Sequence, residues 1–228
     1  MSKLLFSIRV DDVGRKTGDT PENGTDGNLD FFQDWLAAIN SHFIGCPLPM
    51  SLGVTPTWIT RAGWDRLKMI GGGSEIATHG FDHTLRRAWT IPVASMMQVS
   101  IELFEKNGMR RPRSYIPPYN DYRDDDVFAW FQAGGDVFYG FDSRQKPWRV
   151  PQGKHYISCD GGPLYIQSHA TPISYGVANA SMVVIAKPVV TLHVPWMNLE
   201  DCHVFADWVV DLFRMGWECV PIRELCRS

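Results

Sequence analysis

Near the beginning of the chain stands the segment LLFSIRVDD (residues 4–12), an apolar run that ends in two adjacent aspartates, Asp11 and Asp12. A short run rich in aliphatic and aromatic residues is typical of a buried strand. We therefore expect a strand over residues 4–10 that presents both aspartates at its carboxyl end. Such a pair is often only a turn or a helix cap. Its position favours function, because ligands of α/β proteins gather at the carboxyl ends of parallel strands.

A pair of histidines follows a second short strand-like segment. The run EIAT (residues 75–78) is followed by His79 and His83, in a loop or a first helical turn. Two imidazoles and one carboxylate form a three-ligand set for a divalent metal that leaves a position for water. A second carboxylate beside that set is suited to act as a base. Histidines at this spacing also occur by chance, so structural histidines are an equal alternative at this point.

Strands and helices alternate along the rest of the chain. The apolar periodicity and the Gly and Pro breakers predict helices at 29–40, 60–70, 92–107, from 124 onward and at 200–215. They predict strands at 51–54, 75–78, 114–116, 136–141, 164–168, 182–186, 189–193 and 218–220, with a short helix at the end of the chain. No linker, repeat or low-complexity tract interrupts the pattern. A single α/β domain over residues 1–228, with a parallel sheet that is open or closed into a barrel, is the expected architecture.

Composition limits the classes of function. The 228 residues carry a net charge of −3, which gives no basis for a nucleic-acid partner. The five cysteines are odd in number and form no Cys-x-x-Cys pair, which fits reduced thiols. The residues before the first strand do not have the form of a signal peptide, and no stretch has the length of a membrane span. We expect a cytoplasmic protein.

Two later motifs also lie at strand ends. The segment YIPPY (residues 115–119) is either an ordinary turn or a stiff loop that aims Tyr119 into a cleft. The segment TLHVPW (residues 191–196) places His193 at the end of an apolar strand, where a lone histidine is more often structural than catalytic. With the aspartate and histidine pairs, these motifs resemble, in the same order, those of the polysaccharide deacetylases, the NodB-homology proteins of carbohydrate esterase family 4. The resemblance spans residues 4–196. It implies an α/β fold, a distorted (β/α) barrel of seven or eight strands, and a polysaccharide-deacetylase-like catalytic domain.

The resemblance assigns roles to five residues that carry the chemistry. Asp11 matches the catalytic base of the family, and Asp12, His79 and His83 match its metal ligands. His193 matches the general acid that protonates the leaving amine. The cofactor is then a divalent metal, for which we expect zinc, although iron, cobalt or nickel also suit these ligands.

Further positions match less closely. The backbone N–H of Tyr119 matches an oxyanion donor of the family, Leu192 matches the residue that lines the pocket for the acyl methyl, and Asp142 matches an aspartate that tunes the acid histidine. Trp148 and Trp196 are candidates for stacking on a sugar ring, with core packing as the commoner role of a tryptophan.

The chain also departs from the family pattern. The family usually has an arginine before Pro-Pro-Tyr that orients the base, and here that place is taken by Ile116. Arg9, Arg113 and Arg144 are the candidates for replacing it, and the sequence does not choose among them. Gly80 stands where a serine or threonine is usual within the histidine motif. The chain is therefore a divergent version of the pattern.

The implied function is a metal-dependent hydrolase that removes an N-acyl group, acetyl in the first instance, from an amino sugar. A sugar nucleotide or a lipid-linked glycan of bacterial surface-polysaccharide (O-antigen-like) biosynthesis is the expected substrate. Two alternatives stay open: a catalytically inactive glycan-binding protein of the same fold, and an amidohydrolase that acts on a non-sugar amide. The basic run RRPR (residues 110–113) either holds a diphosphate or, more commonly for such runs, forms a solvated turn. The oligomeric state is not indicated.

Overall fold

The computed structural model describes most of the chain. The described residues are 4–14, 29–43, 45, 47–70, 73–85, 88, 90–140, 152–158, 164–165, 188–193, 199 and 202–225.

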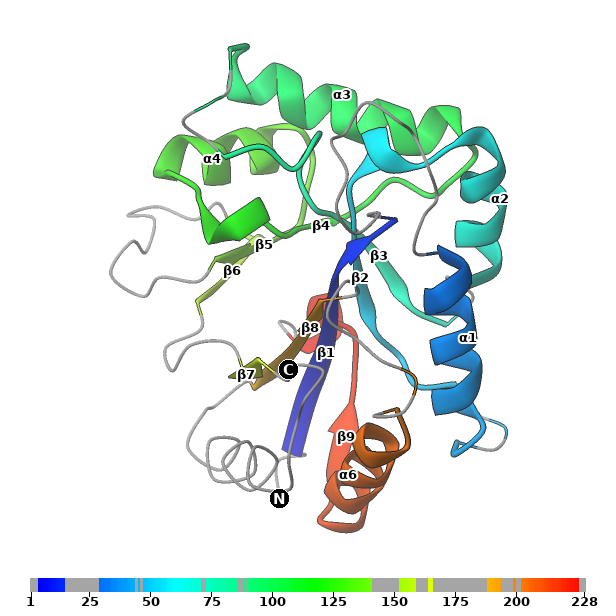
Figure 1. Ribbon diagram of the computed structural model, residues 1–228. Coiled ribbons are helices and arrows are strands. Elements are labelled where there is room, and N and C mark those ends of the chain that lie inside the picture. The colour runs from blue at the N-terminus through cyan, green and yellow to red at the C-terminus, as the bar shows by residue number, and fades with distance from the viewer. Residues whose placement is uncertain are drawn as a thin grey trace.

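A single parallel sheet forms the centre of the molecule (Figure 1). Its strands are β1 (Leu4–Val13), β2 (Ser51–Val54), β3 (Glu75–Thr78), β4 (Ser114–Tyr115), β5 (Val137–Gly140), β6 (His155–Ser158), β7 (Leu164–Tyr165), β8 (Val189–His193) and β9 (Trp217–Cys219). Their order is β6-β5-β4-β3-β2-β1-β8-β7, and β9 pairs with the first residues of β1. The sheet is a half-barrel covered by helices. This confirms the expected α/β class and the NodB-like distorted barrel.

Helices flank the sheet (Figure 1). They are α1 (Leu29–Asn40), α2 (Arg61–Ile70), α3 (Val93–Lys106), α4 (Asp124–Gln132), α6 (Cys202–Arg214) and α7 (Ile222–Leu225), with short 3-10 turns η2 (Pro56–Trp58) and η4 (Pro118–Asn120). None of the described helices has the length and apolar character needed to cross a membrane.

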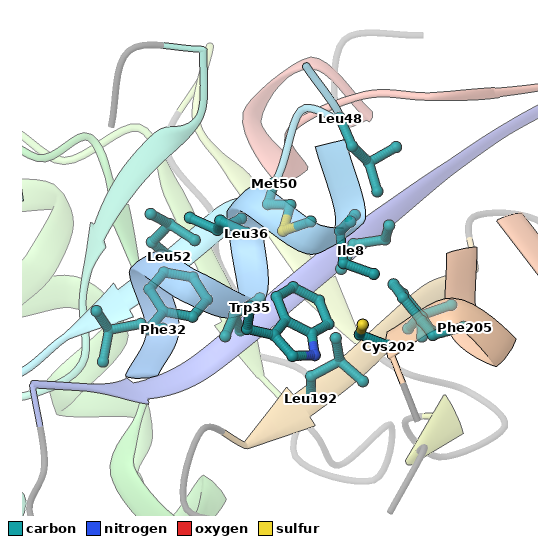
Figure 2. Close-up of a cluster of buried hydrophobic side chains, with 14 of the residues drawn as sticks. Ile8, Phe32, Trp35, Leu36, Leu48, Met50, Leu52, Leu192, Cys202 and Phe205 are labelled. Carbon is teal, nitrogen blue, oxygen red and sulfur yellow. The ribbon is translucent and has the colours of Figure 1, made fainter. Parts of the chain in front are cut away.

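The two faces of β1 separate the core from the site. Side chains alternate along a strand, so Phe6, Ile8 and Val10 share one face. That face packs against α1 and α6 in the largest apolar cluster, which Figure 2 shows around Ile8. The opposite face carries Arg9 and Asp11 into the interior of the half-barrel, where both are buried. The strand that anchors the core therefore also carries polar groups into the interior.

The strand and helix pattern of the sequence is largely confirmed. The helix at 29–40 and the strands at 51–54, 75–78 and 189–193 have the predicted bounds. The first strand continues three residues beyond its predicted end, through both aspartates to Val13. The strand β6 was not predicted, because its four residues show no clear alternation of polar and apolar side chains. The predicted strand at 182–186 lies outside the described residues.

Candidate metal and catalytic site

An irregularity in β1 brings two adjacent aspartates to one site. In a regular strand Asp11 and Asp12 would point to opposite faces of the sheet. Between Val10 and Val13, however, the register with β2 shifts, so that two residues of β1 oppose the single residue Gly53. Asp12 has a φ of 60° at this bulge. A bulge of this kind re-aims a side chain, and here Asp12 turns toward the histidines that follow β3.

Three ligand atoms meet beside this bulge. The Oδ1 atom of Asp12 lies 2.8 Å from Nε2 of His83 and 3.7 Å from Nε2 of His79. Ligand atoms of the three residues all lie within 4.8 Å of one another, and all three residues are buried. Both histidines belong to the loop after β3 rather than to a helix. This geometry allows one divalent ion to be bound by all three residues, in place of the contacts that they make with one another.

His79 is oriented as metal-binding histidines commonly are. Its Nδ1 lies 3.0 Å from the carbonyl oxygen of Ile116. If Nδ1 donates its proton there, Nε2 keeps the lone pair that a metal needs. Burial is the main cause that lowers the pKa of His79 to about 4, so the ring is neutral at neutral pH. The carboxylate and imidazole donors, the orientation of His79 and its neutral state fit a divalent metal such as zinc.

Aromatic rings wall the histidine side of the site. The ring of Tyr119 lies 4.5 Å from that of His83, centroid to centroid, and the ring of Trp58 lies 4.9 Å from it. Tyr119 is 57% exposed, so its ring lies at the protein surface beside the buried His83, and its backbone has a φ of 54°. Trp58 was not singled out from the sequence. The signal that pointed to it was weak, a tryptophan in the Pro-Thr-Trp turn directly after a strand.

Arg9 is the hydrogen-bonding partner of Asp11. Its Nε donates to Oδ1 of Asp11 over 2.7 Å, and its Nη2 donates to Oδ2. The guanidinium also lies 4.7 Å from the ring centroid of Tyr139. Of the other arginines considered, Arg113 is paired with Asp136, and residue 144 lies outside the described residues. The structure thus identifies the arginine that orients Asp11.

His193 completes the cluster from β8. It pairs in register with Asp11, and its Nε2 lies 3.6 Å from Oδ2 of that carboxylate. Burial lowers the pKa of His193, and the aspartates oppose this only in part. Burial would raise the pKa of Asp11, but Arg9 above all brings it below its ordinary value. At neutral pH the site therefore holds an ionised Asp11 next to a neutral His193.

The remaining predicted site residues fall into two groups. Leu192 is 3% exposed and packs in the core cluster near Trp35 and Cys202, as Figure 2 shows. Its side chain points to the opposite face of β8 from His193, so its role in an acyl pocket stays a prediction. Asp142, Trp148 and Trp196 lie outside the described residues.

Comparison with known proteins gives matches in structure. No protein-family model and no curated protein matches the chain. A solved structure of a putative polysaccharide deacetylase from Mycobacterium smegmatis matches with a TM-score of 0.72 at 14% identity, over 99% of this chain and 90% of that one. The chain has the fold of carbohydrate esterase family 4. A family 4 acetyl xylan esterase from Clostridium thermocellum, in complex with cobalt, matches with a TM-score of 0.55 at 16% identity, over 97% and 89% of the two chains.

Inactive proteins of family 4 share this fold as well. A pseudoenzyme from Bacillus anthracis, BA3943, matches with a TM-score of 0.61 at 12% identity over 99% of this chain. The match covers 66% of that protein, so the chain spans about two thirds of its length. A mutant of BA3943 with restored enzymatic activity matches with a TM-score of 0.64 at 12% identity, over 99% of this chain and 68% of that one. The family 4 fold alone therefore does not decide whether a chain is active.

Proposed function

We propose that the chain is a divergent family 4 deacetylase that hydrolyses the N-acetyl group of an amino sugar with the help of a divalent metal. The observation that carries this proposal is the juxtaposition of two groups of side chains. One is the ligand set Asp12, His79 and His83. The other is the proton-transfer pair Asp11 and His193, 3.6 Å apart, beside that set. A metal site alone is common, but a metal site with an adjacent acid–base pair is suited to amide hydrolysis.

Asp12, His79 and His83 would hold the metal, and zinc is the first expectation. A divalent metal in this place supplies a Lewis acid that polarises the substrate carbonyl and makes water a better nucleophile. The chain positions its ligands before binding, because the bulge fixes Asp12 and the Ile116 carbonyl orients His79. A preformed site of this kind limits the rearrangement that binding requires.

Asp11 is suited to accept the proton of the attacking water. A base must be ionised, and the lowered pKa of Asp11 ensures this at neutral pH. Arg9 holds both carboxylate oxygens and so fixes the direction of the remaining lone pairs. A carboxyl group with a low pKa holds a proton only weakly, so it passes that proton on readily.

His193 is suited to deliver a proton to the leaving nitrogen. The imidazole is neutral at rest because burial lowers its pKa, so it must receive a proton before it can donate one. Asp11, whose Oδ2 is 3.6 Å from Nε2 of His193, is the nearest source. The proton taken from water thus moves from Asp11 to His193 and then to the amine. Water and the acetamide are converted to acetate and a free amino group. The N–H of Tyr119 is proposed to stabilise the oxyanion, a contribution that is typically worth about 3 kcal/mol.

The matches to a putative polysaccharide deacetylase and an acetyl xylan esterase favour a carbohydrate substrate. The exposed ring of Tyr119, which packs on His83, is suited to packing against the face of a sugar ring. We propose an N-acetylated amino sugar that is carried on a nucleotide or a lipid, as in the assembly of O-antigen-like surface polysaccharides.

The proposal is tested by acetate release. Purified protein is freed of metal, reloaded with zinc, cobalt, nickel or iron, and incubated with N-acetylated amino sugars, their nucleotide derivatives and acetylated chitooligosaccharides. We expect metal-dependent acetate release with at least one amino-sugar substrate, and its loss in Asp11→Asn. Asp125→Asn, at an exposed position on α4, serves as the matched control. Activity without metal, or metal-dependent activity only on non-sugar amides, would overturn the proposal.

A glycan-binding protein without activity is the second candidate. The observation that favours it is the complete burial of Asp11, both of whose oxygens are already bonded to Arg9. BA3943 shows that the fold also occurs without activity. The same assay decides between the two, because this candidate predicts saturable glycan binding with no acetate release from any substrate under any metal.

A further inference from the structure

A pocket of about 420 Å³ lies at the edge of the sheet opposite the candidate metal site. It is formed by the first residues of β3, the loop between α3 and β4, the end of α2 and the start of α7. Glu75 begins β3 at this edge, whereas His79 follows the other end of the same strand. Four residues of strand separate the two edges by about 13 Å. A ligand in this pocket is therefore separate from the catalytic centre.

Basic side chains dominate the wall of the pocket. They are Lys68, Arg110, Arg111, Arg113 and Arg223. One carboxylate, that of Glu75, also lines it. This carboxylate accepts hydrogen bonds from the hydroxyls of Ser51 and Ser114 and from the backbone N–H of Arg223. It thus ties β2, β4 and α7 together, and it forms no ion pair with any described basic side chain.

Not all of these cations are available to a ligand. Arg113 donates two hydrogen bonds to Asp136, and Arg111 donates to Glu105 and to the backbone carbonyl of Ala133. Lys68 reaches Asp65, but only in an exposed pair of the kind that contributes little. Arg110 and Arg223 form no ion pair within the part of the chain that the structure describes.

Arg223 is the most informative of these residues. Its Nε is buried and has no hydrogen-bond partner among the described residues. A buried guanidinium donor is normally satisfied, so an unsatisfied one on the wall of a pocket marks the place where an acceptor is missing. The planar guanidinium offers parallel donors that match the oxygens of a phosphoryl group. With Arg223 on α7, the basic residues of the pocket come from α2, from the loop between α3 and β4 and from α7, and they line the same space.

We propose that this pocket binds the phosphate or diphosphate group of a small molecule, with Arg223 and Arg110 as its principal ligands. A phosphoryl group carries up to two negative charges and accepts hydrogen bonds from several directions, as this arrangement of donors requires. In this proposal Arg110 binds the ligand, while Arg111 and Arg113 hold the loop against α3 and against the connection between α4 and β5. The inference is independent of the proposed deacetylase activity.

The test is direct binding of inorganic pyrophosphate to the full chain. Calorimetric titration at physiological ionic strength gives the affinity, and the Nε–Hε signal of Arg223 in an NMR spectrum reports the site. We expect saturable binding with a shift of that signal, and an affinity at least tenfold lower in Arg223→Gln and in Arg110→Gln. Arg110 is exposed, so its substitution keeps the test valid if the change at Arg223 disturbs α7.

The matched control is Arg214→Gln. Arg214 lies on the exposed surface of α6 and pairs with Asp211, so its removal changes the net charge by the same amount away from the pocket. We expect unchanged pyrophosphate affinity in this variant. The absence of saturable binding, or equal weakening by all three substitutions, would overturn the proposal, since the latter shows a diffuse effect of charge.

Discussion

The guanidinium of Arg9 extends along β1 and binds both carboxylate oxygens of Asp11, two residues further on in the same strand. Residues i and i+2 of a strand share a face, so this contact is built into the backbone of β1. The arginine usual in family 4 comes from the loop before Pro-Pro-Tyr, where this chain has Ile116. Here the orienting charge comes instead from β1, the strand of the base itself, which β2 and β3 separate from β4 in the sheet.

Removal of this charge should damage catalysis more than folding. In Arg9→Met the buried Asp11 loses its partner, its pKa rises and its orientation is no longer fixed. We expect kcat for acetate release to fall about 100-fold, the usual effect of a misplaced catalytic group. Arg9→Lys should restore part of this loss, because it keeps the charge but not the paired hydrogen bonds. An unchanged kcat in Arg9→Met would show that Asp11 does not need this partner.

A double variant that moves the arginine from position 9 to position 116 tests whether the two positions are equivalent. Ile116 is buried in the same cluster as Tyr139, the ring over which the Arg9 guanidinium lies. The double variant Arg9→Ile/Ile116→Arg keeps the composition and moves the arginine to the family's usual place. We expect it to recover at least tenfold of the activity lost in Arg9→Ile. Circular dichroism checks that both variants are folded, and a folded double variant without recovery would contradict the idea of equivalent positions.

The metal ligands should act as a set. In Asp12→Ala one of three protein ligands is lost and the remaining two imidazoles no longer hold zinc tightly. We expect zinc content after dialysis to fall from about one equivalent to almost none, with activity falling in parallel. His83→Gln should behave similarly, whereas the exposed Asp125→Asn should keep its metal. A zinc content that stays at one equivalent in Asp12→Ala would show that the ligand assignment is wrong.

The sequence predicted those parts of the site that depend on position along a strand. The strand ends could be placed because residues 4–10 and 75–78 are short strand-like runs, and parallel strands bring such ends to one edge. The bulge that turns Asp12 toward His83 could not be predicted, because its signal is only the register between β1 and β2.

Contacts between residues that are distant in the sequence could not be predicted either. Arg9, Arg113 and Arg144 are equivalent candidates in the sequence, and only the fold shows that Arg9 is buried beside Asp11 and Tyr139. Trp58 approaches His83 from a different turn, and no local pattern connects the two. Such choices depend on tertiary neighbours rather than on periodicity.

The backbone conformation at residue 80 accounts for the glycine that stands where the family usually has a serine or threonine, and a substitution there tests this. Its φ is +77°, and a Cβ at this position would lie 2.5 Å from Cγ of Pro118, which precedes Tyr119. Gly80→Ala must therefore strain the backbone and displace the Pro-Pro-Tyr loop. We expect the free energy of unfolding to fall by about 3 kcal/mol and kcat to fall as well. Chemical denaturation and the acetate assay measure both.

Gly153 is the matched control for that substitution. Its φ is +74°, but a Cβ there would meet no atom within 4 Å. Gly153→Ala should cost only the backbone strain, about 1 kcal/mol, with no loss of activity. Equal effects of the two substitutions would show that the contact between residue 80 and Pro118 is unimportant.

The buried His79 should make the metal-free protein sensitive to acid. Burial lowers the pKa of His79 from 6.5 to about 4 in the folded state. Between these values the unfolded chain binds a proton that the folded chain does not, so the free energy of unfolding falls as the pH falls. The full effect of His79 is about 3 kcal/mol, and His193, whose pKa is also lowered, acts in the same direction.

Urea denaturation of the metal-free protein at several pH values between 7 and 4.2 measures this loss. The range ends just above the ordinary pKa of Asp11, 3.8, so the protonation of that group contributes little. The glutamine of His79→Gln cannot be protonated. Between pH 7 and 4.2 the free energy of unfolding of this variant should therefore fall by up to about 3 kcal/mol less than that of the unaltered protein. The exposed His203→Gln should follow the unaltered protein. Parallel curves for His79→Gln and the unaltered protein would mean that His79 is not held neutral in the folded state.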